Sequence, residues 1–184
     1  MKIWCYILFV YPLISSAAPS KLALCISCHG KDGIALQKSW PNLNGQSQNY
    51  IFKQLNDYKF DKRISPIMQP YAKILTAKEM AELAQFYATL PSKTSITSQR
   101  NHLYQNGNSK KRIPACSACH GPNGMGNDFA KFPKISGQNI LYLKEQLRAF
   151  KNHSRNNDSY HIMQDIAARM SKKDIQNISH YLNK

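Results

Sequence analysis

The chain has 184 residues and is strongly basic, with 25 Lys and Arg against 10 Asp and Glu and a formal net charge of +15. This length allows one ordinary domain or two small ones, and so high a charge usually indicates a nucleic acid or another anionic partner. Nucleic acid is excluded as the expected partner, because the first residues predict export from the cytoplasm.

Residues 1–18 have the parts of a secretory signal: Lys2, an apolar run from Ile3 to Ile14, and small residues at the end. The apolar run is shorter than the roughly 20 residues that a membrane-spanning helix needs, which argues against an anchor. We therefore expect cleavage near Ala17 or Ala18 and a mature protein in the periplasm.

The remainder of the chain contains an internal repeat. Three motifs occur twice in the same order, namely C-x-x-C-H-G, P-x-[Leu/Ile]-x-G-Q and Tyr-(x)3-Gln-Leu, at residues 25–30 and 116–121, 41–46 and 133–138, and 50–55 and 142–147. A repeat of this kind predicts a duplicated domain. We predict a first domain at residues 19–91, a polar, Ser/Thr-rich linker at 92–99 and a second domain at 100–184.

Each copy has the pattern of helices joined by loops. Apolar residues recur at helical spacing over residues 47–58 and again over 139–150. The last helix of each copy has a capping box, in which a hydroxyl residue is followed three positions later by an acid: Thr76 and Glu79, Ser171 and Asp174. No stretch alternates as a strand would, so the predicted fold class is all-α.

The C-x-x-C-H motif is the attachment signature of haem c. Two thiols one helical turn apart can bond the two vinyl groups of one porphyrin, and the adjacent His reaches the iron from the proximal side. A thioredoxin-like pair would need a βαβ context, and a zinc site would need four converging thiolates. Loss of Cys5 with the signal leaves only the motif cysteines, so no disulfide is expected. We predict two covalently bound haem c groups, attached through Cys25, Cys28, Cys116 and Cys119, with His29 and His120 on the iron.

The sixth iron ligand is narrowed by elimination in the first copy, where Met68 and Met80 are the candidates. Met80 belongs to the apolar face of a capped helix and is expected in the core, whereas Met68 is expected in a loop between helices. In the second copy Met163 occupies the position equivalent to Met68. His161 lies two residues away and remains its rival.

Two prolines follow the attachment motifs at similar distances. The carbonyl groups of Pro41 and Pro133 could accept the Nδ1 protons of His29 and His120 and fix the orientation of each ring. A simple turn proline is the alternative, and the sequence leaves both interpretations open.

With these motifs assembled, the chain resembles the bacterial dihaem cytochrome c4 family. The resemblance implies two tandem class I cytochrome c-like domains, each wrapped around one covalent haem c and facing each other about a pseudo-twofold axis. It also implies the ligand set of the sites, with attachment at Cys25, Cys28, Cys116 and Cys119 and axial ligands His29, Met68, His120 and Met163. One departure is the short segment before Cys25, which leaves the packing of a first helix against residues 77–90 unsupported.

The expected function is transfer of single electrons in a respiratory chain, without catalysis on a substrate. The expected partners are redox proteins: a quinol-oxidising complex or dehydrogenase upstream and, as the resemblance implies, a terminal haem–copper oxidase downstream. Peripheral contact with an anionic membrane is a further possibility for so basic a protein, which we expect to be a monomer. The alternatives are a haem subunit of a periplasmic dehydrogenase and a small dihaem peroxidase, although a peroxidase needs one open distal position.

Overall fold

The computed structural model describes residues 18–92, here called the first unit, and residues 101–183, the second unit. All but the last residue of the predicted signal, most of the predicted linker and the last residue of the chain lie outside the described residues. Within these two units no helix is long and apolar enough to cross a membrane.

The described chain is helical, as predicted, and its only strand-like pairings in the two units are isolated bridges. The first unit contains α1 (Leu22–His29), α2 (Gln48–Lys59), α3 (Met68–Lys73) and α4 (Ala77–Thr89). The second contains α5 (His102–Asn106), the 3-10 turn η1 (Ser109–Lys111), α6 (Ser117–His120), α7 (Ile140–Lys151), the 3-10 turn η2 (Ser159–His161), α8 (Ile162–Arg169) and α9 (Lys172–Leu182).

The predicted start signals of the last helix in each unit are confirmed. The Thr76 side chain accepts a hydrogen bond from the Glu79 amide, and the Glu79 carboxylate accepts one from the Thr76 amide at 2.8 Å. Ser171 and Asp174 form the same reciprocal pair at the start of α9. Because each box satisfies two backbone N–H groups that would otherwise lack partners, both helices begin where the sequence places them.

The prediction that Met68 lies in a loop is wrong. Met68 is the first residue of α3, and Met163 is the second residue of α8. The amide of Met68 donates to the Ser65 hydroxyl at 3.2 Å, and the amide of Met163 donates to the Asp158 carboxylate at 2.8 Å. These side chains satisfy free N–H groups of the first turn, so short helices form where the apolar periodicity is too brief to predict them.

Each unit has its own hydrophobic core, formed mainly by α2 with α4 and by α7 with α9. Met80 is only 1% exposed and packs with Leu75 and Leu83, which confirms its expected place in the core. Leu22 and Cys25 of α1 pack against this cluster. The short segment before Cys25 is therefore long enough for the first helix to pack against α4, a contact that the sequence alone did not support.

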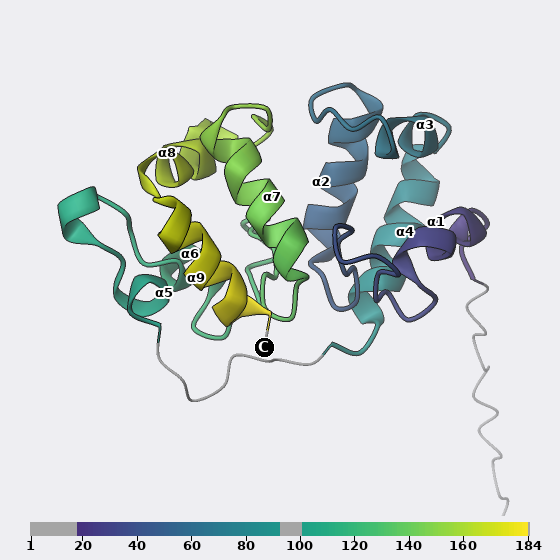
Figure 1. Cartoon of the computed structure of the whole chain (residues 1–184). Helices are drawn as coiled ribbons and strands as arrows, with labels where there is room; N and C mark the ends of the chain where they lie inside the picture. The colour runs from purple at the N-terminus through teal and green to yellow at the C-terminus, as the bar shows by residue number, and fades with distance from the viewer. Residues whose placement is uncertain (1–17, 93–100, 184) are drawn as a thin grey trace, which may run out of the picture.

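The two units face each other through α2 and α7, which lie side by side at the centre of the molecule (Figure 1). Two glutamines cross the interface in matching ways. Gln46 accepts from the Lys134 amide and donates to the Lys134 carbonyl, both at 2.8 Å. Gln138 makes the same pair of bonds with the backbone of Asn42, at 2.8 and 2.9 Å. This exchange is the pseudo-twofold relation that the repeated G-Q dipeptide encodes.

We predict that Gln46→Ala and Gln138→Ala each destabilise the haem-loaded protein by roughly 2–3 kcal/mol, because each leaves a backbone N–H and C=O at the interface without partners. Calorimetry of each variant should also show one unfolding transition broadening toward two.

Asn44→Ala is the matched control, since Asn44 donates to the Pro91 carbonyl within its own unit, at 3.0 Å. Equal losses in all three variants, with unfolding still a single transition, would contradict the assignment of the glutamines to the interface.

Candidate haem sites

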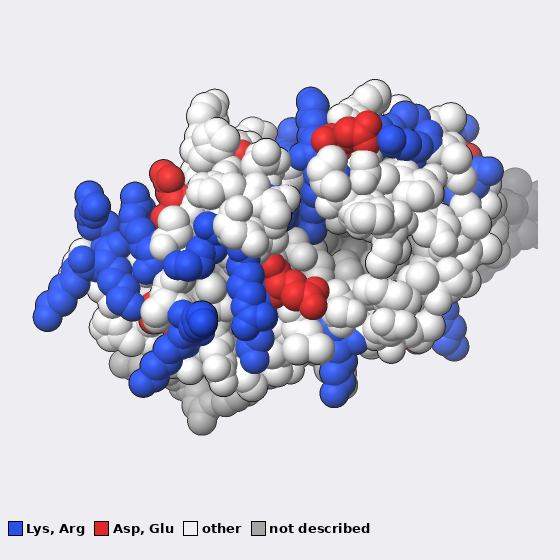
Figure 2. Space-filling view, turned by 45° about the horizontal axis from the view of Figure 1, so that its top comes forward, with Lys and Arg blue, Asp and Glu red and all other residues white. Residues whose placement is uncertain are grey.

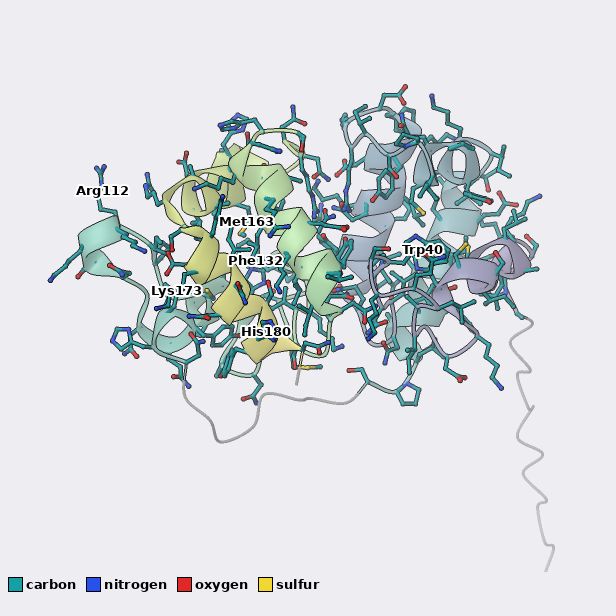
Figure 3. All side chains as sticks on the ribbon, in the orientation of Figure 1. Trp40, Arg112, Phe132, Met163, Lys173 and His180 are labelled. Carbon is teal, nitrogen blue, oxygen red and sulfur yellow. The ribbon has the colours of Figure 1, made fainter. Side chains whose placement is uncertain are left out.

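The first Cys-x-x-Cys-His motif lies on α1 and ends it. Cys25, Cys28 and His29 line a cavity of about 420 Å³, and Met68 lines the same cavity. Gly30 follows the motif with φ of +73°, where a Cβ atom would meet the Ile34 carbonyl oxygen at 2.2 Å. The chain therefore needs glycine to leave the helix directly after the histidine. The indole of Trp40 also lines this cavity (Figure 3).

The second motif begins at Cys116, the residue that precedes α6, and continues through that helix. Its cysteines and His120 line a cavity of about 330 Å³ together with Met163. This cavity also reaches His29 and Met68 of the first unit, so it crosses the interface and contacts both predicted His–Met pairs. Both volumes fall within the range of cofactor sites. Met163 points into the second unit (Figure 3), whereas the rival His161 is exposed and contacts Gln164 at 2.5 Å.

Each histidine is oriented by the carbonyl group of the predicted proline. The Nδ1 atom of His29 lies 3.0 Å from the Pro41 oxygen, and that of His120 lies 2.9 Å from the Pro133 oxygen. A carbonyl only accepts, so this contact places the proton on Nδ1 and leaves the Nε2 lone pair available. Burial lowers the pKa of both histidines, and the carbonyl contact offsets part of that shift, so the rings favour the neutral form that binds metals.

The thiols of the two motifs differ from those of redox-active pairs. Burial, with a smaller contribution from Cys28, raises the pKa of Cys25 to about 11, and burial raises that of Cys116 to about 11. Dithiol oxidoreductases need the opposite shift, because the thiolate is the nucleophile. None of the four motif cysteines forms a disulfide.

A buried guanidinium, that of Arg63, lies between the two cavities. Arg63 is 7% exposed and donates at 2.7 Å to Gln54 of its own unit. Across the interface it donates to Gln146 at 2.7 Å and to the Tyr142 hydroxyl at 3.1 Å. Its guanidinium carbon also lies 4.8 Å from the centre of the Tyr58 ring, a cation–π contact.

Arg155 repeats this arrangement in the second unit. It is 8% exposed and donates to Gln146 of its own unit at 2.7 Å. It also donates across the interface to the Tyr50 hydroxyl and to Gln54, at 2.9 and 3.2 Å. The Tyr-(x)3-Gln-Leu motifs are therefore repeated because they hold a pair of crossing arginines.

Sequence reasoning missed both arginines, although the repeat contains the signal. Arg63 follows Gln54 by nine residues, and Arg155 follows Gln146 by the same nine. The intervening residues differ between the copies, which hides the correspondence.

These two cations are a test of whether the cavities fit haem. Among the ion pairs within residues 18–92 and 101–183, neither Arg63 nor Arg155 has a carboxylate partner. Both line the cavities, and a buried charge with only neutral acceptors is costly. Haem carries two anionic propionates, which such a cation would neutralise. Each cavity also offers thiols, a neutral imidazole and a thioether. This set of groups fits haem.

Comparisons with known proteins agree with this geometry. The sequence family described as Cytochrome c matches residues 102–184. Cytochrome c4 of Thiocapsa roseopersicina is 41% identical over 165 residues, covering 86% of this chain and 85% of the relative. A thiosulfate dehydrogenase electron acceptor of Stutzerimonas stutzeri is 36% identical, covering 90% and 80%. The crystal structure of reduced cytochrome c4 from Pseudomonas stutzeri superimposes with a TM-score of 0.82 at 33% identity, covering 89% and 94%.

The all-α fold and the two motif-bearing cavities define a c-type cytochrome, a class of electron-transfer protein with covalently attached haem. Within that class, the chain belongs to the cytochrome c4 family. It is accordingly an electron carrier and not an enzyme.

We predict that Arg63→Met destabilises the haem-loaded protein by about 3–5 kcal/mol, because the propionate of a bound haem would lose this buried cation. Urea unfolding followed at the Soret band measures the change. Arg148→Met, on the exposed face of α7, is the control and should stay within about 0.5 kcal/mol of the parent.

The opposite outcome would contradict the pairing of Arg63 with an anionic group. If Arg63 met only neutral groups in the loaded protein, replacing it with an apolar side chain of similar volume would leave the stability unchanged or raise it.

Proposed function

We propose that the protein carries two haem c groups, one in each unit, and moves electrons one at a time. Cys25 and Cys28 would hold the first haem and Cys116 and Cys119 the second, each through two thioether bonds. His29 with Met68, and His120 with Met163, would be the axial ligands. The observation that supports this most strongly is that both His–Met pairs line one cavity across a pseudo-twofold interface.

The residues of the chain suit electron transfer better than chemistry on a substrate. With His and Met on the iron, the protein fills both axial positions, and a thioether favours the ferrous state. The proline carbonyls hold each imidazole in one orientation. The arginines hold two positive charges in the shared cavity, and positive charge stabilises the reduced form of a nearby centre. A peroxidase would need one of the methionines to leave.

Different groups fix the two methionines. Met68 follows the hydroxyl of Ser65, which accepts its amide proton. The carboxylate of Asp158 accepts from the amides of both Met163 and Gln164, and from the Gln164 side chain at 2.8 Å. The amide of Met163 is therefore bonded to a charged carboxylate and that of Met68 to a neutral hydroxyl. Because a charge beside only one haem would shift its potential alone, the two haems should have different reduction potentials.

We place the protein in the periplasm, after removal of residues 1–18 as a signal, and expect a monomer. Electrons would arrive from a quinol-oxidising complex or a dehydrogenase and leave to a terminal haem–copper oxidase. The relatives named thiosulfate dehydrogenase electron acceptors favour the dehydrogenase as a source. This name also keeps open a second role, as the haem subunit of a periplasmic dehydrogenase complex.

The ligand assignment predicts that Met68→Leu and Met163→Leu each remove about half of the weak methionine-to-iron absorption band in the far red. Leucine keeps the volume of the side chain but lacks the thioether sulfur, so the fold should lose no more than about 1.5 kcal/mol. The measurement is an oxidised spectrum of protein expressed in the periplasm, with haem counted by pyridine haemochrome.

Met80→Leu is the matched control, because Met80 is a buried core residue of the first unit. It should keep two haems and the full band. A parent protein with one haem would contradict the dihaem proposal, and a Met163→Leu variant with an unchanged band would return His161 as the sixth ligand.

A further inference from the structure

The positive charge of the chain is concentrated in the second unit. Residues 101–184 contain 13 Lys and Arg against 5 Asp and Glu, whereas residues 19–91 contain 9 against 5. Figure 2 shows Lys and Arg side chains gathered at the end of the molecule that belongs to the second unit and lies farthest from the first. Six basic residues from two segments make up this region, which we call the basic pole: Lys110, Lys111, Arg112, Arg169, Lys172 and Lys173.

The two segments of the basic pole are joined by direct contacts. Arg169, at the end of α8, donates to the Arg112 carbonyl at 3.3 Å, and Lys111 pairs with Asp174 of α9 at 2.5 Å. Arg112 has a left-handed backbone conformation with φ of +54°, which residues other than glycine rarely adopt. Its label in Figure 3 lies at the tip of the unit, and that of Lys173 lies nearer to Met163.

Most of this charge has no counter-ion. Asp174 pairs with Lys111, and among the ion pairs of the two described units none includes the other five cations. All five of those cations lie at exposed positions of two different segments, Lys110 and Arg112 on one and Arg169, Lys172 and Lys173 on the other. The fold thus fastens two basic segments together although their like charges repel, which a merely solvated surface does not require.

The basic pole is continuous with the wall of the second haem cavity. Pro114, Ala115 and Cys116 line that cavity and directly follow the loop that carries Arg112. Met170, which also lines it, lies between Arg169 and Lys172. A partner on the basic pole would therefore sit beside the second site and away from the first unit.

The chemistry of the surface selects the kind of partner. Of the large apolar side chains exposed in the two described units, none lies in residues 101–113 or 163–183. Stable attachment to a bilayer usually combines basic residues with apolar side chains that enter the lipid. Charge without apolar anchors is instead typical of a surface that steers a soluble partner into a short-lived complex.

We infer that the basic pole is the docking surface for the acidic face of a redox protein that exchanges electrons with the second unit. This inference rests on the proposed electron-carrier function. The mouth of the first cavity is different, because exposed Leu24, Ile64 and Ile67 line it. The acidic partner is therefore expected at one end of the molecule only.

The test compares two variants that lose the same charge in different places. One is Lys110→Gln, Arg112→Gln, Lys172→Gln and Lys173→Gln, which leaves the Lys111–Asp174 pair intact. The control is Lys31→Gln, Lys38→Gln, Lys62→Gln and Lys78→Gln, all exposed positions of the first unit. Both are made in the haem-loaded protein, so any effect of net charge alone is equal in the two.

Two readouts are used at low salt. The first is the affinity for a polyglutamate peptide of about 20 residues, and the second is the rate at which ferricyanide, a trianion, oxidises the reduced protein. We expect the basic-pole variant to lose about tenfold in both, and the control variant to lose clearly less. The difference should vanish at about 1 M salt, where the screening length falls to about 3 Å.

Equal losses in the two variants would overturn the inference, because net charge alone would explain them. So would a basic-pole variant that keeps its affinity for polyglutamate but loses binding to phosphatidylglycerol vesicles, since the partner would then be a membrane. Haem count and the far-red band are measured on the same samples. A parent protein that fails those two measurements contradicts the proposed function, whereas normal spectra with equal losses contradict only the docking surface.

Discussion

Two buried guanidinium groups that cross at the centre of the molecule determine how the rest of it is arranged. Arg63 and Arg155 each reach from one unit into the other and find only amide oxygens and phenol hydroxyls among the described residues. Two like charges are stable so close together only if anionic groups neutralise them. The propionates of bound haem would supply such anions, so we expect haem loading to stabilise the contact between the two units.

The repeated motifs have separate tasks in this arrangement. The C-x-x-C-H-G copies place thiols and an imidazole at each cavity, the G-Q copies bond the backbone of the opposite unit, and the Tyr-(x)3-Gln-Leu copies support the arginines. Because the G-Q and Tyr-(x)3-Gln-Leu copies act on the other unit, the duplication is more than two independent domains in tandem. The core helices α4 and α9, by contrast, serve only their own unit.

The sequence predicted what depends on short-range chemistry. The capping boxes at Thr76 and Ser171 and the amphipathic helices each involve neighbours along the chain or the repeat itself. The sequence left open whether the prolines contact the histidines, and the structure shows that they do. The helices that begin at Met68 and Ile162 were not predicted, because one or two turns are too short to show a helical periodicity of apolar residues. Their start signals are the side chains of Ser65 and Asp158. Arg63 and Arg155 were missed because a buried arginine is indistinguishable from a surface one until its partners in the other unit are known.

The segment that follows each attachment motif has two neighbours at once. The Pro133 carbonyl holds the ring of His120, and the next residue, Lys134, is bonded through its backbone to Gln46 of the opposite unit. Pro41 and Asn42 stand in the same relation to His29 and Gln138. In each unit a single peptide group therefore contacts the imidazole through its carbonyl and the opposite unit through its N–H. The orientation of each imidazole thus depends on how the two units pack together. A separately expressed half would lose that contact, and its spectrum and potential would describe a different iron environment from the one in the intact chain.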